Sequence, residues 1–284
     1  MTFWSIQILN ALSLAMLLFL LSAGLSIIFG LMRIINLAHG SFYLLGGYVA
    51  LSVIAFTGDF WLGLLSAALS IGIFSAVIHR TLLQRVQHNE LAQVLLTFGL
   101  LLMISDFALW LWGGLPRTLP RPDFLEGAVR VGSLTFPVYR VALTFAGLAA
   151  ALLIWLVLDR TKIGAIVRAG VDDPEMVRGI GIDIGRVFTA VFASGAMMAA
   201  IAGVLGGALL GLYPGADFDV VLLAFAVVVI GGLGSLKGAF VGSLFIGFVD
   251  TFGKALMPRY ALFTIFVPMA IMLAVRPKGL FGRA

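Results

Sequence analysis

Long apolar runs follow one another along most of this chain, and short polar segments separate them. The runs carry few or no charges and cover residues 5–32, 34–57, 60–78, 91–112, 141–158, 187–212, 220–236, 238–253 and 260–275. A helix needs roughly 20 apolar residues to cross a hydrocarbon core of about 30 Å. The runs are continuous, whereas the strands of a membrane barrel would alternate apolar and polar residues. The pattern therefore predicts an all-α membrane protein with eight or nine membrane-spanning helices.

One region interrupts this pattern, between the last residues of run 220–236 and the start of run 238–253. Its sequence IGGLGSLKGAFVG, residues 230–242, places five glycines and a lysine between two short apolar runs. Two full spans fit it, and so does a broken or re-entrant helix. A break would expose backbone groups to a cavity, and small residues would let helices approach closely. The candidate pathway or gating residues here are Gly231, Gly232, Gly234 and Ser235.

The composition agrees with a location inside a membrane. Apolar residues make up 62% of the chain and charged residues 11%, whereas a soluble domain carries about 25% charged residues. No charge precedes Arg33, so the first run lacks the basic start of a signal peptide and predicts a retained helix. The absence of cysteine excludes disulfides, thiolate metal sites and cysteine nucleophiles. The basic residues are scattered, so nucleic acid is not an expected partner.

The distribution of lysine and arginine predicts an orientation, because cytoplasmic loops are enriched in them. If the loops around 80–90 and 159–186 are cytoplasmic, twelve basic residues lie inside and six outside. This choice places the N-terminus outside and the C-terminus in the cytoplasm. The loop 114–140 is then periplasmic, and its sequence VRVGSLTFP favours a short β-hairpin.

The cytoplasmic loop 159–186 contains ten of the chain's 31 charged residues. Its sequence predicts two short helices separated by a turn. Asp172 or Asp173 can cap the second helix, Pro174 suits its first position, and Glu175 favours its positive end. Gly179 can end it. A docking element and an ordinary solvated loop both fit this pattern.

Polar residues interrupt the second apolar run at the sequence NLAHGS. Asn36, His39 and Ser41 lie there beside Gly40, and polar groups at membrane depth face a bundle interior or a water-filled cavity. One hypothesis makes this segment the start of a broken helix that lines a solute pathway. The other places it at the cytoplasmic end of the span, where its side chains pair with backbone groups. Thr97 and Gly99, in the run 91–112, are further candidates for lining the pathway.

Two carboxylates fall within or near apolar runs, where a central charge costs about 2.5–3.5 kcal/mol. Each could couple ion movement to transport. Asp106 is close enough to Gly113 to reach the membrane interface, and Asp250 is one helical turn from Lys254, so an ion pair is expected. A metal site is not expected, because no ligand spacing connects the three histidines His39, His79 and His88.

Four segments of the chain resemble permeases of ATP-binding-cassette importers in the branched-chain amino acid family. They are GLSIIFGLMRIINLAHGSFYLLGGYVA (24–50), LLTFGL (95–100), GAIVRAGVDDPEMVRGIGID (164–183) and VVVIGGLGSLKGAFVGSLFIGFVD (227–250). The whole chain, 1–284, is most similar to the first of the two permease subunits, which is a single transmembrane domain. The resemblance implies a bacterial inner-membrane protein.

The resemblance also implies a function and partners. The function would be import of branched-chain or other hydrophobic amino acids, handed over by a periplasmic binding protein. The partners would be a homologous second permease and two cytoplasmic ATPases. The chain contains no G-x-x-x-x-G-K-[ST] phosphate loop, so we expect a transport subunit rather than an enzyme, with no cofactor of its own and ATP bound by the partners.

In this family the second short helix of the cytoplasmic loop docks in a cleft of the ATPase. The resemblance assigns polar contacts in that cleft to Arg168, Asp172, Asp173, Glu175 and Arg178, on a helix that begins at Pro174 and ends at Gly179, with Met176 and Val177 packing.

Other functions stay open at this point. Related permeases carry urea or amides, and an ion-coupled carrier would use Asp106, Asp250 or His39. A membrane serine protease would need His39 with Ser41, Ser194 or Ser235, but no G-x-S-x-G setting is present. A membrane scaffold without transport activity has no positive support in the sequence.

Overall fold

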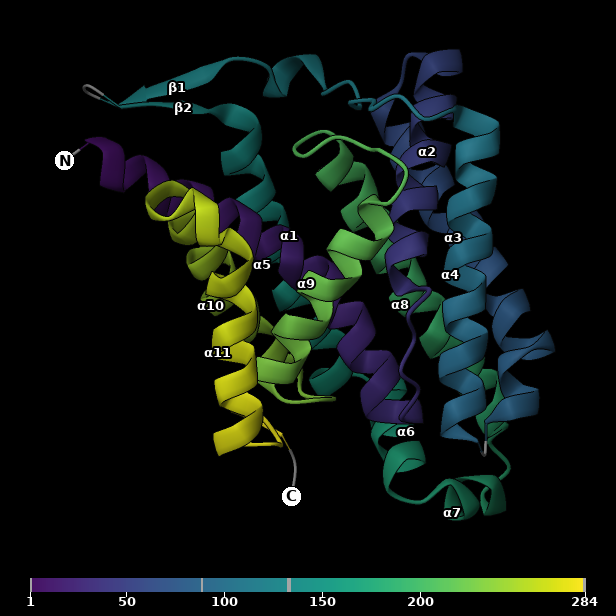
Figure 1. Cartoon of the computed structure of the whole chain (residues 1–284). Coiled ribbons are helices and arrows are strands. Elements are labelled where there is room, and N and C mark those ends of the chain that lie inside the picture. The colour runs from purple at the N-terminus through teal and green to yellow at the C-terminus, as the bar shows by residue number, and fades with distance from the viewer. Residues whose placement is uncertain (1, 88, 132–133, 283–284) are drawn as a thin grey trace.

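The computed structural model describes residues 2–87, 89–131 and 134–282, and these residues form a helical bundle (Figure 1). His88 lies outside the described residues. The α-helices are α1 (Thr2–Met32), α2 (His39–Thr57), α3 (Phe60–Thr81), α4 (Glu90–Trp112), α5 (Val138–Arg160), α6 (Lys162–Asp172), α7 (Pro174–Gly179), α8 (Ile184–Gly207), α9 (Ala216–Gly231), α10 (Leu236–Leu256) and α11 (Ala261–Val275). Short 3-10 turns cover Leu83–Val86, Asp123–Leu125 and Pro258–Tyr260.

All nine predicted apolar runs form helices, which confirms the all-α class. Among the described residues, seven helices rather than eight or nine are long and apolar enough to cross a membrane: α1–α5, α8 and α10. The other two runs give α9 and α11, with 16 and 15 residues. α9 begins at Ala216, four residues before the predicted run, and the glycine-rich break ends it at Gly231. The protein is a multi-pass membrane protein.

The two ends of the bundle carry different segments (Figure 1). The N-terminus and the strands β1 (Ala128–Val131) and β2 (Leu134–Pro137) lie at one end, and α6, α7 and the C-terminal tail lie at the other. The strands pair antiparallel, as the hairpin prediction required, although turn residues 132 and 133 lie outside the described residues. The segments predicted to be cytoplasmic therefore share one end of the bundle.

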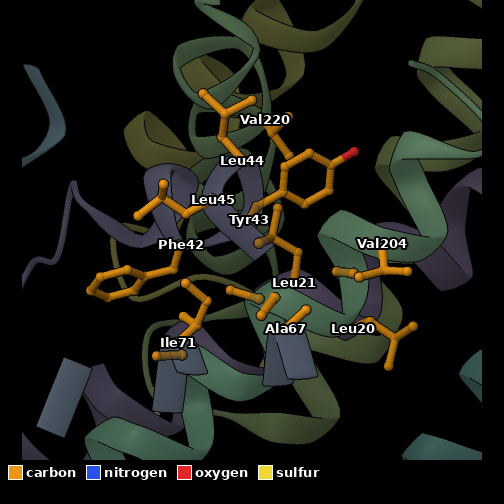
Figure 2. Packing of buried hydrophobic residues seen from close by; sticks show 14 of the residues in the cluster. Leu20, Leu21, Phe42, Tyr43, Leu44, Leu45, Ala67, Ile71, Val204 and Val220 are labelled. Carbon is orange, nitrogen blue, oxygen red and sulfur yellow. The ribbon is translucent and has the colours of Figure 1, made fainter. Parts of the chain in front are cut away.

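α2 runs through the middle of the core and is buried for most of its length. Figure 2 shows Phe42, Tyr43, Leu44 and Leu45 pointing to different sides of this helix. They pack against the neighbouring helices α1, α3, α8 and α9, through Leu20, Leu21, Ala67, Ile71, Val204 and Val220. A helix that is apolar all round belongs in the interior of a bundle, and α2 has this character.

Small residues set the distances between these helices. A Cβ atom added to Gly46 of α2 would lie 2.5 Å from the Cα atom of Ala200 in α8. One added to Gly24 of α1 would lie 2.5 Å from the carbonyl oxygen of Gly195, also in α8. Small residues of α8 therefore allow this helix to pack closely against α1 and α2.

Two of the predicted apolar runs contain a non-helical segment. Residues 33–36 form no regular secondary structure, and α2 begins only at His39 rather than near residue 34. The second break separates α9 from α10, where Gly232 and Gly234 have φ of +107° and +78°. Ser235 then caps α10 by accepting a hydrogen bond from the backbone N–H of Gly238 at 3.1 Å.

The C-terminal tail completes the end of α9. The backbone N–H groups of Leu280 and Phe281 donate to the carbonyl oxygens of Ile230 and Gly231, each at 2.9 Å. Helix ends leave carbonyl groups without partners inside the helix, and here the tail supplies the donors.

The contact between α2 and α8 can be tested by Gly46→Ala. The added methyl group collides with backbone atoms of Ala200, so we expect a loss of about 1–3 kcal/mol of stability and a lower thermal unfolding midpoint in detergent. Gly99→Ala in α4 is the control, because nothing lies within 4 Å of the new atom there and alanine favours helix. An unchanged midpoint for Gly46→Ala would contradict the close approach of the two helices.

Candidate functional site

α7 is a short helix whose start is fixed by a side-chain cap. The carboxylate of Asp173 accepts hydrogen bonds from the backbone N–H groups of Glu175 and Met176, at 3.0 and 2.9 Å. Pro174 occupies the first turn, and the helix ends at Gly179. The cap and both boundaries are as predicted, and Asp173 rather than Asp172 is the capping residue.

The surface of α7 combines charges with an exposed apolar side chain. Asp172, Glu175 and Arg178 are exposed, and Met176 between them is 57% exposed. Val177, which was expected to pack in the partner's cleft, is instead buried within this chain at 1% exposure. α7 thus has one side fixed to the bundle and one side free to meet another molecule.

Arg168 in α6 contacts the end of α5. Its guanidinium donates to the carbonyl oxygen of Leu158 and lies 3.3 Å from a carboxylate oxygen of Asp159. Its expected role was contact with an ATPase, but the structure engages it within the chain. This contact joins α6 to the long apolar helix α5.

The polar residues of the NLAHGS segment are all buried. The Nε2 atom of His39 lies 3.0 Å from the carbonyl oxygen of Leu21, as expected if its side chain pairs with backbone. Thr97 of α4 donates to the carbonyl oxygen of Ile35 at 3.2 Å. The side-chain nitrogen and oxygen of Asn36 have no hydrogen-bond partner among the described residues. The segment between α1 and α2, residues 33–38, therefore lies between α1 and α4.

A buried carboxylate that the sequence analysis missed lies beside Ser41. Ser41 of α2 donates a hydrogen bond to Oδ2 of Asp217 at 3.1 Å, and Ser105 of α4 donates to Oδ1 at 3.4 Å. Gly40 permits this arrangement, because a Cβ atom there would collide with the backbone carbonyl of Asp217. Three helices thus meet at one acidic side chain.

The structure separates the candidate pathway residues into two groups. Ser41 bonds to Asp217 at the start of α9 and contacts α4 at Leu101, and Thr97 of α4 bonds to Ile35 before α2. Gly231 is at the opposite end of α9. Gly234 packs closely against Gly30 of α1: a Cβ atom added to Gly30 would lie 2.9 Å from the Cα atom of Gly234. The glycine-rich break is therefore a close helix contact and does not belong to the polar cluster.

Comparison with known proteins identifies the family. Residues 7–275 match the family described as the permease component of branched-chain amino acid transport systems. This chain belongs to that family.

Individual relatives align with nearly the whole of this family member. The permease protein LivH of the high-affinity branched-chain amino acid transport system of Escherichia coli strain K12 is 28% identical, over 98% of this chain and 95% of LivH. The permease protein BraD of the corresponding system of Pseudomonas aeruginosa is 26% identical over the same shares. The xylose/arabinose import permease protein XylH of Sulfolobus acidocaldarius is 31% identical over 64% of this chain and 51% of XylH. No solved structure matches this chain.

The two carboxylates singled out in the sequence have different surroundings in this permease component. Asp250 is buried and forms an ion pair with Lys254 at 2.7 Å, as its spacing predicted. Asp106 is exposed on the outer surface of α4. A buried carboxylate paired by its own helix is a local structural unit, so neither residue resembles an ion-coupling site.

Sequence reasoning missed Asp217 because it set the boundaries of apolar runs at charged residues. That rule placed Asp217 and Asp219 in a loop before the run 220–236. The available signal was the turn PGADFD: its proline and glycine start a helix, which carries the next acidic residue into the bundle.

The Asp173 cap can be tested by local hydrogen exchange in α7. Asp173→Ala removes the acceptor for two backbone N–H groups, which costs about 1 kcal/mol of local stability and makes the amides of residues 175–179 exchange about fivefold faster. Asp173→Asn keeps a side-chain oxygen at the same position and should exchange at nearly the wild-type rate. Equal rates in all three proteins would show that the cap does not hold α7.

Proposed function

We propose that this chain is a membrane permease subunit of an ATP-driven importer of branched-chain and related hydrophobic amino acids. The observation that carries the proposal is the alignment of 98% of the chain with permeases named for branched-chain amino acid transport. A match of this length includes the docking segment, both helix breaks and the core helices. The importer would receive its solute from a periplasmic binding protein.

The exposed side of α7 supports docking of a cytoplasmic ATPase. Asp172, Glu175 and Arg178 surround the half-exposed Met176, and an apolar side chain ringed by polar groups is typical of a strong contact in protein interfaces. This chain has no phosphate loop of its own, so ATP would be bound by the ATPase subunits. The chain itself would then need no cofactor.

The contacts of α6 and α7 give a route for mechanical coupling. Movement of α7 would act on the bundle through buried Val177, and movement of α6 would act on α5 through Arg168. Rigid helix shifts of this kind change which side of a transporter is open. ATP-driven closure of the ATPases would supply the force.

The exposed apolar helices support a second membrane partner in addition to lipid. In their most apolar segments, only 22% of α4 residues and 11% of α5 residues are buried within the chain. A homologous second permease could cover one of these surfaces. We place the complex in the bacterial inner membrane, with α6, α7 and the C-terminal tail in the cytoplasm and the N-terminus outside, because basic residues concentrate at the α7 end.

A related small solute, such as urea or an amide, is the nearest alternative, and the name of XylH widens the range of solutes among its relatives. An ion-coupled carrier is the alternative in mechanism. The carrier has weaker support, because Asp250 is already neutralised by Lys254.

The importer and the carrier respond differently to two sets of substitutions. Asp172→Lys combined with Glu175→Lys reverses the charge of the α7 surface and leaves the Asp173 cap in place. In an importer we expect leucine uptake and solute-stimulated ATP hydrolysis to fall at least about tenfold, since charge repulsion across an interface costs several kcal/mol. Both rates are measured in proteoliposomes that contain the ATPases, the second permease and the binding protein.

Asp250→Asn is the matched test of the carrier. An importer should keep most of its leucine uptake, whereas a carrier that uses this carboxylate should lose it. Uptake that survives charge reversal on α7 but disappears in Asp250→Asn would refute the importer. Uptake of urea or a pentose in place of leucine would support the importer mechanism and contradict the proposed solute.

A further inference from the structure

Asp217 is fully buried and has no basic partner in the described part of the chain. Its carboxylate accepts hydrogen bonds from the hydroxyl groups of Ser41 and Ser105, which come from two other helices, and from the backbone of Asp217 and Phe218 at the start of α9. A buried carboxylate without a cation is costly even when it is hydrogen-bonded, and a cation that joins it stabilises it. The arrangement contrasts with Asp250, which is equally buried but paired with Lys254.

Asp217 lies on a line of polar groups between α2 and α4, which we name the α2–α4 seam. The seam is formed by Ser41, Tyr48 and Ser52 of α2 and by Thr97, Ser105 and Trp112 of α4. The members from α4 recur at intervals of seven or eight residues, so they share one face of that helix. Hydroxyl groups and an indole thus follow one another along the depth of the membrane.

Contacts along the seam connect the two helices at successive levels. Thr97 bonds to the segment before α2, Ser41 lies 3.5 Å from the carbonyl oxygen of Leu101, and Trp112 donates to Ser52 at 2.8 Å. The ring of Trp112 also stacks on Tyr48, with centroids 4.9 Å apart. A lipid-facing contact between apolar helices would not need this many polar groups.

Two buried polar side chains, Tyr48 of the seam and Asn36 beside it, have no hydrogen-bond partner in the described part of the chain. The hydroxyl of Tyr48 has no hydrogen bond among the described residues, and Tyr48 lies within electrostatic range of Asp217. The amide of Asn36, next to the Ile35 carbonyl that binds Thr97, has none either. Buried polar groups in native proteins usually have hydrogen-bond partners, and a polar solute that passes along the seam would supply them for these two side chains.

We propose that Asp217, held by Ser41 and Ser105, binds the ammonium group of an amino acid that passes along the α2–α4 seam. This inference rests on the proposed transport function. A neutral amino acid carries an ammonium group and a carboxylate on one carbon atom. Asp217 supplies the acceptor for the first, and the free donors of Tyr48 and Asn36 can serve the second on the way.

The seam is closed over Asp217 in this structure, and α4 is the helix that can open it. Its most apolar segment is only 22% buried within the chain, whereas the corresponding segment of α2 is 61% buried. Movement of α4 away from α2 would expose the carboxylate while the core around α2 stays packed. The site is thus a transient resting place for the solute rather than a tight receptor.

The test compares Asp217→Asn with Asp250→Asn in the complete transporter. Leucine uptake and ATP hydrolysis are measured in the same proteoliposomes, with the binding protein and ATPases present. We expect Asp217→Asn to lower leucine uptake per ATP hydrolysed at least about tenfold, because a charge-assisted contact is lost, while ATP hydrolysis changes less than about twofold. Asp250→Asn, which also removes a buried carboxylate, should keep the wild-type ratio.

If Asp217→Asn does not assemble into the transporter, substitutions of the two serines that bond to Asp217 test the same site. Ser41→Ala and Ser105→Ala should each lower the ratio of uptake to hydrolysis by about threefold, since each removes one bond to the charge. Ser75→Ala is the control, because Ser75 is fully buried and bonds only to a carbonyl of its own helix in the described structure. Wild-type ratios in Ser41→Ala and Ser105→Ala would overturn the proposal.

Two further results separate this proposal from its rivals. If wild-type vesicles hydrolyse ATP but do not accumulate leucine, the proposed function fails before the site is tested. If wild-type vesicles accumulate leucine and Asp217→Asn does so at the same ratio, only the site fails. Uptake that acidifies the vesicle interior in wild type but not in Asp217→Asn would show that Asp217 carries a proton, and this would overturn the ammonium site.

Discussion

The burial of α2 constrains most of this structure. Because other helices surround residues 39–50, most side chains in this part of α2 meet another helix, and the distances between the helix axes are set by the side chains that fit there. Gly40 and Gly46 allow the backbones of α9 and α8 to come close, and larger side chains such as Tyr43 fill the remaining space. The outer helices α4 and α5 then attach to a core whose dimensions are already determined.

The same burial decides where the polar groups of α2 find partners. Lipid and water are both excluded there, so His39 bonds to the carbonyl of Leu21 and Ser41 bonds to Asp217. Each bond ties α2 to a different neighbour, α1 in the first case and α9 in the second. Polar residues that would weaken a lipid-facing helix therefore define the register of a buried one.

Much of the fold follows from local sequence signals, and the remainder depends on long-range contacts. The apolar runs, the Asp173 cap and the pair Asp250–Lys254 each involve residues within a helix or a turn, so pattern and spacing were sufficient to predict them. The meeting of Ser41, Ser105 and Asp217 joins positions up to 176 residues apart, and no local signal contains it. The end of α9 was placed too late for a related reason, since apolar character continues past Gly231, where the glycine-rich break ends this helix.

The short helices α6 and α7 contain examples of both kinds within a few residues. The position and cap of α7 were predictable because proline, aspartate and glycine act on their own neighbours. The difference in exposure between Met176, which is exposed, and Val177, which is buried, depends on how α7 packs against the bundle. The same holds for Arg168, whose partner at the end of α5 is ten residues earlier in the chain.

The hydrogen bonds from Leu280 and Phe281 to Ile230 and Gly231 also determine when the end of α9 can reach its final geometry during synthesis. The carbonyl groups at the end of α9 emerge from the ribosome about 50 residues before the donors that satisfy them. Until then α9 and α10 can enter the membrane, but the break between them lacks two of its hydrogen bonds. The final geometry of this break is therefore acquired late, after α11 has been made and has returned the chain to the same end of the bundle.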